Sequence, residues 1–277
     1  MADRLFTTAV YLLVILVIGA LLWVIGDLVI GGLSRLSWSF LVEAPSDAGR
    51  AGGIAPILVS TLLILAVALA VALPLGLAVA VWLAEFTRPG RSAAQGIRLT
   101  LDVLAGVPSI VYGLFGHAFF SLVLGLRFSI LSGGLTLACM ILPLFVRTCE
   151  SGLSAVDDGW RAGARALGMS RTSTVWHILL PAASPAILAG LMLGIGRATA
   201  ETAALLFTSG YVDRMPGSLL DSGRALAVHI FELSMNVSGG DEAAYASAFV
   251  LILVIVALNL MAQLVTDRWL TRRIQRS

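Results

Sequence analysis

Six long apolar runs constrain the fold of this chain more than any other feature of its sequence. The hydrocarbon core of a membrane is about 30 Å thick, so a helix that rises about 1.5 Å per residue needs about 20 apolar residues to cross it. Runs of this length predict helical spans at about residues 6–28, 57–84, 99–124, 128–147, 185–208 and 244–266. The expected fold is therefore an all-α, polytopic membrane protein with six transmembrane helices.

Composition excludes the main alternatives to a helical membrane protein. Apolar residues make up 58% of the chain and charged residues 12%, whereas soluble domains carry roughly 25% charge. This excludes soluble globular, disordered and disulfide-stapled proteins, and it argues against a barrel whose strands alternate apolar and polar residues. The net charge of +2 gives no indication of nucleic-acid binding. Cys139 and Cys149 form no CxxC or Cys/His motif, so no metal site is expected.

The arginines predict which side of the membrane each loop faces. The chain has 18 basic residues, all of them arginine, and cytoplasmic loops carry an excess of basic residues. If both termini face the cytoplasm, 12 arginines lie on that side, five lie outside and Arg197 lies within a span. We therefore expect both termini to be cytoplasmic. The first apolar run is long enough to span, so we expect an uncleaved helix and a single membrane domain over residues 1–277.

The segment between the fourth and fifth spans, residues 150–181, shows a helical pattern. Gly168 suits the C-terminal cap of one short helix, and a second short helix ends before Pro181. We expect both helices to lie flat on the cytoplasmic face, where they either dock a soluble partner or rest on lipid headgroups. Five apolar residues spaced by three or four positions form one stripe on the first helix: Leu153, Val156, Trp160, Ala164 and Leu167.

This loop resembles the coupling loop of ABC importer permeases, whose consensus is Glu-Ala-Ala, three residues, Gly, nine residues and Ile-x-Leu-Pro. Ala162 replaces the glutamate of that consensus, and Gly163 replaces one alanine. In that family the loop docks into a groove of the ATP-hydrolysing subunit, and the resemblance implies the same role for residues 150–181, Trp160 included. The positions that carry the resemblance are Ala162, Gly163, Ala164, Gly168, Ile178, Leu180 and Pro181.

Arg197 and Glu201 lie inside the predicted fifth span. Counted from Pro185, Arg197 lies about 18 Å along the helix, near mid-bilayer, where a charge costs about 2.5–3.5 kcal/mol. Glu201 follows one turn later and can pair with Arg197. Two interpretations stay open. One is a salt bridge that fixes helix packing, and the other is a polar pathway for an anion, in which Arg197 supplies charge and forked donors. A helical wheel places Thr208 on the same face.

The residues around this pair resemble the PstA permease family of phosphate ABC importers. The segment Gly196–Thr208 is similar to that family's signature, Ala-Arg-Ala-x-Gly-Glu-Thr-Ala-Pro-Leu-Leu-Phe-Thr. Ala200 stands where the family usually has glycine, and Ala204 where it has proline. Upstream, Leu104–Gly116 resembles the family's third span. Together with the coupling loop, the resemblance covers roughly residues 55–265.

The resemblance implies a type I ABC importer permease in a bacterial cytoplasmic membrane. The implied partners, besides membrane lipid, are a second six-span permease (PstC-like), two copies of a cytoplasmic ATPase (PstB-like) and an external phosphate-binding protein (PstS-like). The implied function is phosphate import by alternating access, with ATP and Mg²⁺ acted on by the ATPase. This chain has no GxxxxGK[ST] loop and no lysine to complete one. We therefore expect it to carry no catalytic residue and to bind no cofactor.

Pro108 interrupts backbone hydrogen bonding inside the third span. With Ser109 it marks either a helix kink or a gate. Two alternatives to phosphate import also stay open: an ABC permease for another oxyanion such as sulfate or molybdate, and a secondary transporter that works without ATP. An intramembrane enzyme is not indicated, because the spans contain no paired aspartates, HExxH motif or Ser/His arrangement.

Overall fold

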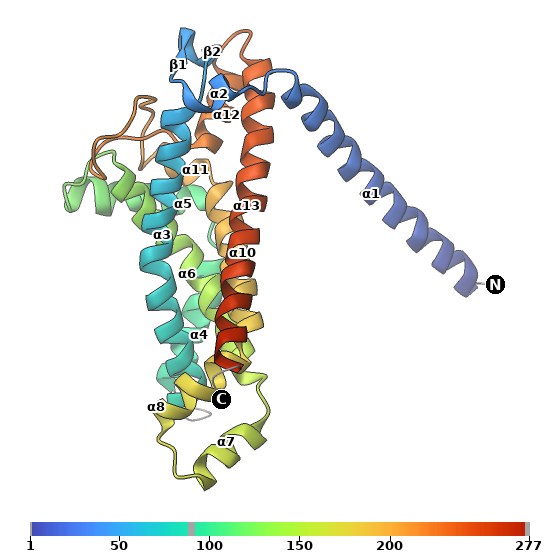
Figure 1. Ribbon diagram of the computed structural model, residues 1–277, viewed down its shortest axis with the longest axis vertical. Coiled ribbons are helices and arrows are strands. Elements are labelled where there is room, and N and C mark those ends of the chain that lie inside the picture. The colour runs from blue at the N-terminus through green and yellow to red at the C-terminus, as the bar shows by residue number, and fades with distance from the viewer. Residues whose placement is uncertain (1, 88–91, 275–277) are drawn as a thin grey trace.

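The computed structural model describes residues 2–87 and 92–274. Arg88, Arg91 and Arg276, which count toward the cytoplasmic side, lie outside the described residues. Within that part of the chain, four helices are long and apolar enough to cross a membrane, and the number rises to six if each of two bent helix pairs is one span. Figure 1 shows the long helices running side by side, except for the first, which stands away from the bundle.

The centre of the bundle is the pair of helices α3 (Ala55–Val81) and α6 (Ile130–Ser154). A π-helical turn, η2 (Trp82–Phe86), extends α3 at its C-terminal end. Fully buried alanines on α3 face α6, and small side chains let membrane helices approach closely. The α3–α6 contact is the most extensive between any two elements of the described chain, so these helices form the scaffold on which the others are placed.

The predicted third span is not one straight helix. Helix α4 (Ser92–Ala105) is followed by α5 (Ser109–Gly116) and the π-helical turn η3 (His117–Val123). The two halves meet at an angle of 103°. Pro108 cannot donate a backbone hydrogen bond and disfavours helix at the residue before it. The interruption expected at Pro108 in the predicted span at residues 99–124 is therefore present, as a sharp bend between two helices.

The cytoplasmic loop predicted at residues 150–181 contains several short helical segments. They are α7 (Asp158–Ala166), α8 (Arg171–Thr174), the π-helical turn η4 (Val175–Leu179) and α9 (Leu180–Ala182). Helix α10 (Ser184–Thr199) then turns by 69° from the preceding segment. A break at residues 200–202 separates α10 from the short helix α11 (Ala203–Leu206). The predicted fifth span at residues 185–208 is thus divided as well.

The remaining elements are two long helices and several short elements at the two ends of the bundle. Helix α13 (Asp241–Ile274) is continuous and follows the short apolar helix α12 (Leu226–Met235). Helix α1 (Ala2–Leu33) touches α13 near one end, where the Tyr245 hydroxyl donates to Asp27 at 3.0 Å. Figure 1 places α7, α8 and the C-terminal end of α13 at one end of the bundle. The opposite end carries α2 (Trp38–Val42), β1 (Pro45–Ser46), η1 (Asp47–Gly49) and β2 (Ala51–Gly52), with β1 and β2 antiparallel.

Candidate functional site

Arg197 lies in the last turn of α10. This helix has Pro185 in its first turn, where proline is tolerated, and it ends at Thr199. The amide of Ala200 donates to the carbonyl of Gly196 at 3.2 Å and closes the helix. A positive charge near a helix C-terminus interacts favourably with the helix dipole, so this position suits an arginine.

Glu201 lies in the break that follows α10. The sequence pattern places Arg197 and Glu201 on one face of a single helix, but the helix ends before Glu201, so this expectation is wrong. The Glu201 carboxylate accepts a hydrogen bond from the amide of Ala204 at 3.1 Å, which caps α11. Among the described residues no ion pair includes Arg197 or Glu201. The two charges therefore have separate environments in this conformation.

The Arg197 side chain is exposed on the surface of this chain. It lies within electrostatic reach of Tyr112 on α5. At mid-membrane depth a guanidinium that faces lipid is costly. Because the sequence places Arg197 near this depth, we expect it to face a second protein or a water-filled pathway. Its role in a pathway stays a prediction, as does that of Glu201.

Thr208 differs from Arg197 in that it is fully buried. Its hydroxyl donates to the carbonyl of Ala204 at 2.8 Å, and its own carbonyl accepts from the amide of Ser129 at 3.0 Å. The hydroxyl thus holds Thr208 to α11, and the carbonyl holds this segment against the start of α6. A direct contact between Thr208 and a transported ion would require this segment to move.

Pro108 and Ser109 form the start of α5, at the break in the third span. Pro108 is the N-terminal cap residue of α5, and Ser109 is the first helical residue. The Tyr112 hydroxyl donates across the break to the carbonyl of Leu104 at 2.9 Å. The corner between α4 and α5 is therefore held by a side chain as well as by the backbone.

The two broken spans lie against each other. Helix α5 packs on α11, and a Cβ atom added at Gly113 would lie 2.9 Å from the Cα atom of Ala204. Such a close approach of two backbones requires glycine at this position. Irregular backbone at membrane depth is tolerated where it is buried in protein or lines a water-filled cavity. The region where α10 ends beside α5 is therefore the candidate site for ion passage.

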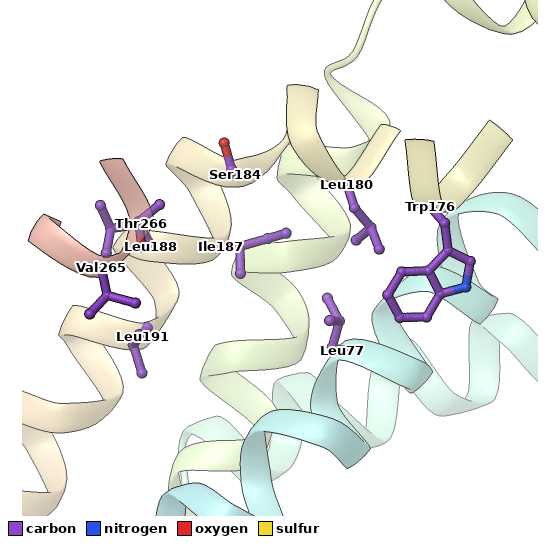
Figure 2. A pocket seen from close by; sticks show the side chains of 9 residues that line it. All are labelled: Leu77, Trp176, Leu180, Ser184, Ile187, Leu188, Leu191, Val265 and Thr266. Atoms are coloured by element: carbon purple, nitrogen blue, oxygen red, sulfur yellow. The ribbon is translucent and has the colours of Figure 1, made fainter. Parts of the chain in front are cut away.

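A separate groove of about 260 Å³ lies at the ends of α3, α10 and α13. Figure 2 shows that apolar side chains dominate its lining. The Ser184 hydroxyl already donates to the carbonyl of Pro181, and the Thr266 hydroxyl to that of Ala262. An anion would find no charged group here, so this groove is not the candidate site. Its lining consists of Leu77, Trp176, Leu180, Ser184, Ile187, Leu188, Leu191, Val265 and Thr266.

The loop predicted to dock an ATPase has well-defined caps. The Asp157 side chain accepts from the amide of Gly159 at 2.6 Å at the start of α7. Gly168 has a φ of +70° after its end, where glycine is favoured. The amide of Met169 donates to the carbonyl of Ala164 at 3.0 Å, which completes a Schellman motif. These caps fix where α7 starts and stops.

The residues matched to the coupling-loop consensus divide between the surface and the interior of this chain. Ala164, Leu180 and the preceding Leu179 are buried, whereas Ile178 and Pro181 are partly exposed. The side chain of Trp160 is 59% exposed and that of Leu167 is 80% exposed. Large apolar side chains exposed beside the consensus residues are typical of a binding surface. The exposed consensus positions are Ala162, Gly163 and Gly168.

Arg161 connects α7 to the membrane helices through an ion pair and several hydrogen bonds. Its Nη2 atom lies 2.6 Å from Oε1 of Glu85 in η2, and its Nε atom lies 3.2 Å from both carboxylate oxygens. Its Nη2 atom also donates to the carbonyl of Leu153 in the last turn of α6 at 2.8 Å, and its Nη1 atom to the carbonyl of Val156, which follows α6, at 2.6 Å. Hydrogen bonding to Glu85 is the main reason that the pKa of Arg161 is raised above its ordinary value.

A second ionic cluster joins α4 to α6 near the same end. Glu150 is buried and accepts from Arg98 at 2.6 Å and from Arg147 at 3.0 Å. Arg147 also pairs with Asp102 at 2.9 Å, and Arg98 donates to the carbonyl of Leu83 in η2 at 3.1 Å. Buried charges need such partners because desolvation is costly.

Sequence reasoning missed these ionic contacts and the end of α10. Arg161 and Glu85 are 76 positions apart, and no local spacing relates them. The break after Thr199 lies among small residues that also suit a helix, and only the capping type of Thr202 could have indicated it. The buried position of Glu150 had no local signal, because Arg147 and Thr148 separate it from the apolar run that ends at Val146.

The broken apolar spans, together with a capped two-helix loop at one end of the bundle, define an integral membrane permease of the ABC importer type. The chain belongs to the family of binding-protein-dependent transport system inner membrane components, whose model matches residues 72–275.

Several named permease proteins are similar to this chain in sequence. The chain is 30% identical to the probable ABC transporter permease protein YqgI of Bacillus subtilis, over 97% of this chain and 94% of that one. It is 34% identical to the phosphate transport system permease protein PstA 1 of Mycobacterium tuberculosis, over 82% of this chain and 75% of that one. It is 28% identical to the phosphate transport system permease protein PstA of Haemophilus influenzae, over 92% and 90%.

Solved structures resemble this chain in fold. A bacterial alginate ABC transporter in complex with its alginate pentasaccharide-bound periplasmic protein has a chain that matches with a TM-score of 0.66 and 13% identity, covering 97% of this chain and 94% of that one. The inward-facing methionine ABC transporter MetNI matches with a TM-score of 0.56 and 18% identity, covering 79% and 96%. At these identities the likeness concerns the fold alone.

Proposed function

We propose that this chain is the permease subunit of an ATP-driven importer that carries inorganic phosphate across the cytoplasmic membrane. One observation of the site carries the proposal: Arg197, in a membrane-spanning helix, pairs with no carboxylate of the described chain and faces outward beside two helix breaks. The relatives named for phosphate transport support phosphate as the anion. A guanidinium offers forked donors that suit phosphate oxygens.

The transport step follows from the charges at the site. Arg197 attracts the oxyanion into the low-dielectric region, where an unpaired anion would otherwise be costly. Glu201, close by in the chain, keeps the binding weak enough for release. The breaks at Pro108–Ser109 and after Thr199 are the points at which the spans can change direction, which alternating access requires.

The rest of the machinery lies in other subunits. We assign the second half of the pathway to another six-span permease (PstC-like), ATP and Mg²⁺ binding to two copies of a cytoplasmic ATPase (PstB-like), and substrate capture to an external phosphate-binding protein (PstS-like). The loop at residues 150–181 docks on the ATPase, with Trp160 and Leu167 as its exposed apolar contacts. Both termini and this loop face the cytoplasm. This chain contributes no catalytic group.

The test is ATP turnover by the assembled complex in proteoliposomes. Binding protein loaded with phosphate should stimulate hydrolysis, and sulfate or molybdate should not. Stimulation by sulfate or molybdate instead would assign the permease to that oxyanion. Anion transport by the chain alone, unaffected by deletion of residues 157–181, would contradict an ATP-driven mechanism and indicate a secondary transporter.

A further inference from the structure

Helix α7 has few contacts with the membrane helices through which it could transmit force. Figure 1 shows it at the end of the bundle, joined to α6 and α8 by extended segments. Ala164 is the only residue of α7 that is buried. A helix held by so little apolar packing would move independently of the bundle unless polar contacts fastened it.

The Arg161 side chain supplies those contacts. It reaches two elements at once: the Glu85 carboxylate in η2, at 2.6 Å, and two carbonyls, one in the last turn of α6, at 2.8 Å, and one just after the C-terminal cap of α6, at 2.6 Å. The carbonyls belong to Leu153 and Val156. A planar guanidinium with five donors can hold such an arrangement in one orientation, whereas a single ammonium group cannot.

Burial separates this contact from ordinary surface ion pairs. The side chains of Arg161 and Glu85 are 20% and 12% exposed. Asp158, a second partner of Arg161 at 3.2 Å, is 96% exposed. Exposed pairs contribute little because water and salt screen them. The Glu85 contact is therefore the one that fixes the position of Arg161, and with it that of α7.

We propose that Arg161 and Glu85 are positioning residues that couple movement of the docking loop to the membrane helices α3 and α6. The proposal rests on the proposed function, since it assumes that α7 docks on an ATPase. It does not depend on which anion is carried. Neither residue would touch ATP or the transported ion.

Further polar contacts lead from the Arg161–Glu85 contact toward the candidate site. Leu83, two residues before Glu85, accepts a hydrogen bond from Arg98 of α4 through its carbonyl. Arg98 binds Glu150 of α6, and α4 leads to the break before Pro108. Displacement of η2 and α6 by α7 therefore reaches α4 through polar contacts that are already formed.

The experiment compares Glu85→Gln and Arg161→Gln with the double variant in the full complex, reconstituted with ATPase, second permease and binding protein. The measured quantity is labelled phosphate imported per ATP hydrolysed. Allosteric coupling typically changes an equilibrium about 5–150-fold, so we expect each single variant to lower this ratio by about tenfold. The ATPase should still co-purify, because the exposed face of α7 is unchanged. The double variant should be no worse than either single one, because both remove the same contact.

A second measurement follows α7 directly and needs no substrate. Amide hydrogen exchange of residues 158–166 should become faster in Glu85→Gln and Arg161→Gln. The matched control is Glu232→Gln on α12, which also removes one negative charge. The Glu232 carboxylate accepts a hydrogen bond from the Asn236 side chain at 2.8 Å. This control should keep the wild-type ratio and exchange rate.

Three results would overturn the proposal: a wild-type transport ratio in both single variants, additive losses in the double variant, or unchanged exchange of α7. Failure of the proposed substrate gives a different result. A wild-type complex that hydrolyses ATP without any response to phosphate would contradict phosphate as the ion, and the exchange rates would then decide whether Arg161 and Glu85 hold α7.

Discussion

Arg197 combines a costly position with an exposed side chain. The sequence identified this residue because a charge inside an apolar run is rare. The sequence could not show whether Glu201 neutralises Arg197, because their pairing depends on whether one helix carries both residues. In the structure, α10 ends between the two residues, and the Glu201 carboxylate accepts a hydrogen bond from the amide of Ala204. Arg197 is then available to an anion in this conformation.

We expect Arg197→Gln to lower phosphate transport by more than about tenfold, because a hydrogen bond to a charged group is worth about 1.5–3 kcal/mol. Glutamine keeps polarity and most of the length but loses the charge. The complex should still assemble. The check is labelled phosphate uptake into proteoliposomes, with Arg214→Gln, an exposed arginine between α11 and α12, as the control. Wild-type uptake by Arg197→Gln would remove this residue from the pathway.

His229, on α12 and outside the six spans, makes stability depend on pH. It is fully buried, its Nδ1 atom lies 3.4 Å from Nη1 of Arg224, and within the described chain its Nε2 atom has no hydrogen-bond partner. Burial first, and the Arg224 charge second, lower the pKa of His229 to about 3. The unfolded chain takes up a proton as pH falls through about 6.5, but the folded chain does not until about 3. The free energy of unfolding therefore decreases as the pH is lowered from about 6.5 toward about 3.

We expect the melting temperature of the purified protein to fall between pH 7.5 and pH 5, and to fall less in His229→Gln. The glutamine side chain does not titrate, so the part of the pH dependence that comes from this site disappears. The measurement is a thermal melt in detergent at several pH values. Identical pH dependence in the wild type and the variant would show that burial of His229 does not set it.

At the level of elements, the docking loop was predictable in its cap but not in the bounds of its helices. Its cap at Gly168 follows a local rule and is confirmed. The predicted apolar stripe on one helix is wrong, because Leu153 lies in α6 and Val156 in the break before α7. The helix expected to end before Pro181 continues to Ala182, because proline is tolerated in the first turn of α9. The broken spans were less predictable. Pro108 indicated an interruption, but the 103° angle depends on how α5 packs on α11. That packing depends on Gly113, whose role no local pattern reveals.

Gly168→Pro should release the ATPase from the membrane complex. Proline is restricted to φ near −65°, whereas Gly168 has a φ of +70° and its amide donates to the carbonyl of Arg165. The substitution therefore removes the cap that ends α7. Co-purification of the ATPase measures the effect. Gly239→Pro is the control, because it places the same strain, at a φ of +75°, between α12 and α13. Intact co-purification by Gly168→Pro would count against this loop as the dock.

At the level of the whole molecule, the sequence predicted the class of protein and its six apolar segments, because bilayer thickness sets the length of each. It could not predict which helices touch. The clusters around Glu150 and Arg161 join residues far apart in the chain, and helix α1 stands away from the bundle with its apolar side chains exposed. We expect lipid or a second subunit to cover that apolar surface.

The most direct test of the central claim is labelled phosphate uptake at limiting phosphate, in cells that carry or lack this chain and have no second phosphate system. The account predicts that high-affinity uptake is lost without the chain, restored by the intact chain and not restored by Arg197→Gln. High-affinity phosphate uptake that is the same with and without the chain would contradict the assignment of phosphate as its substrate.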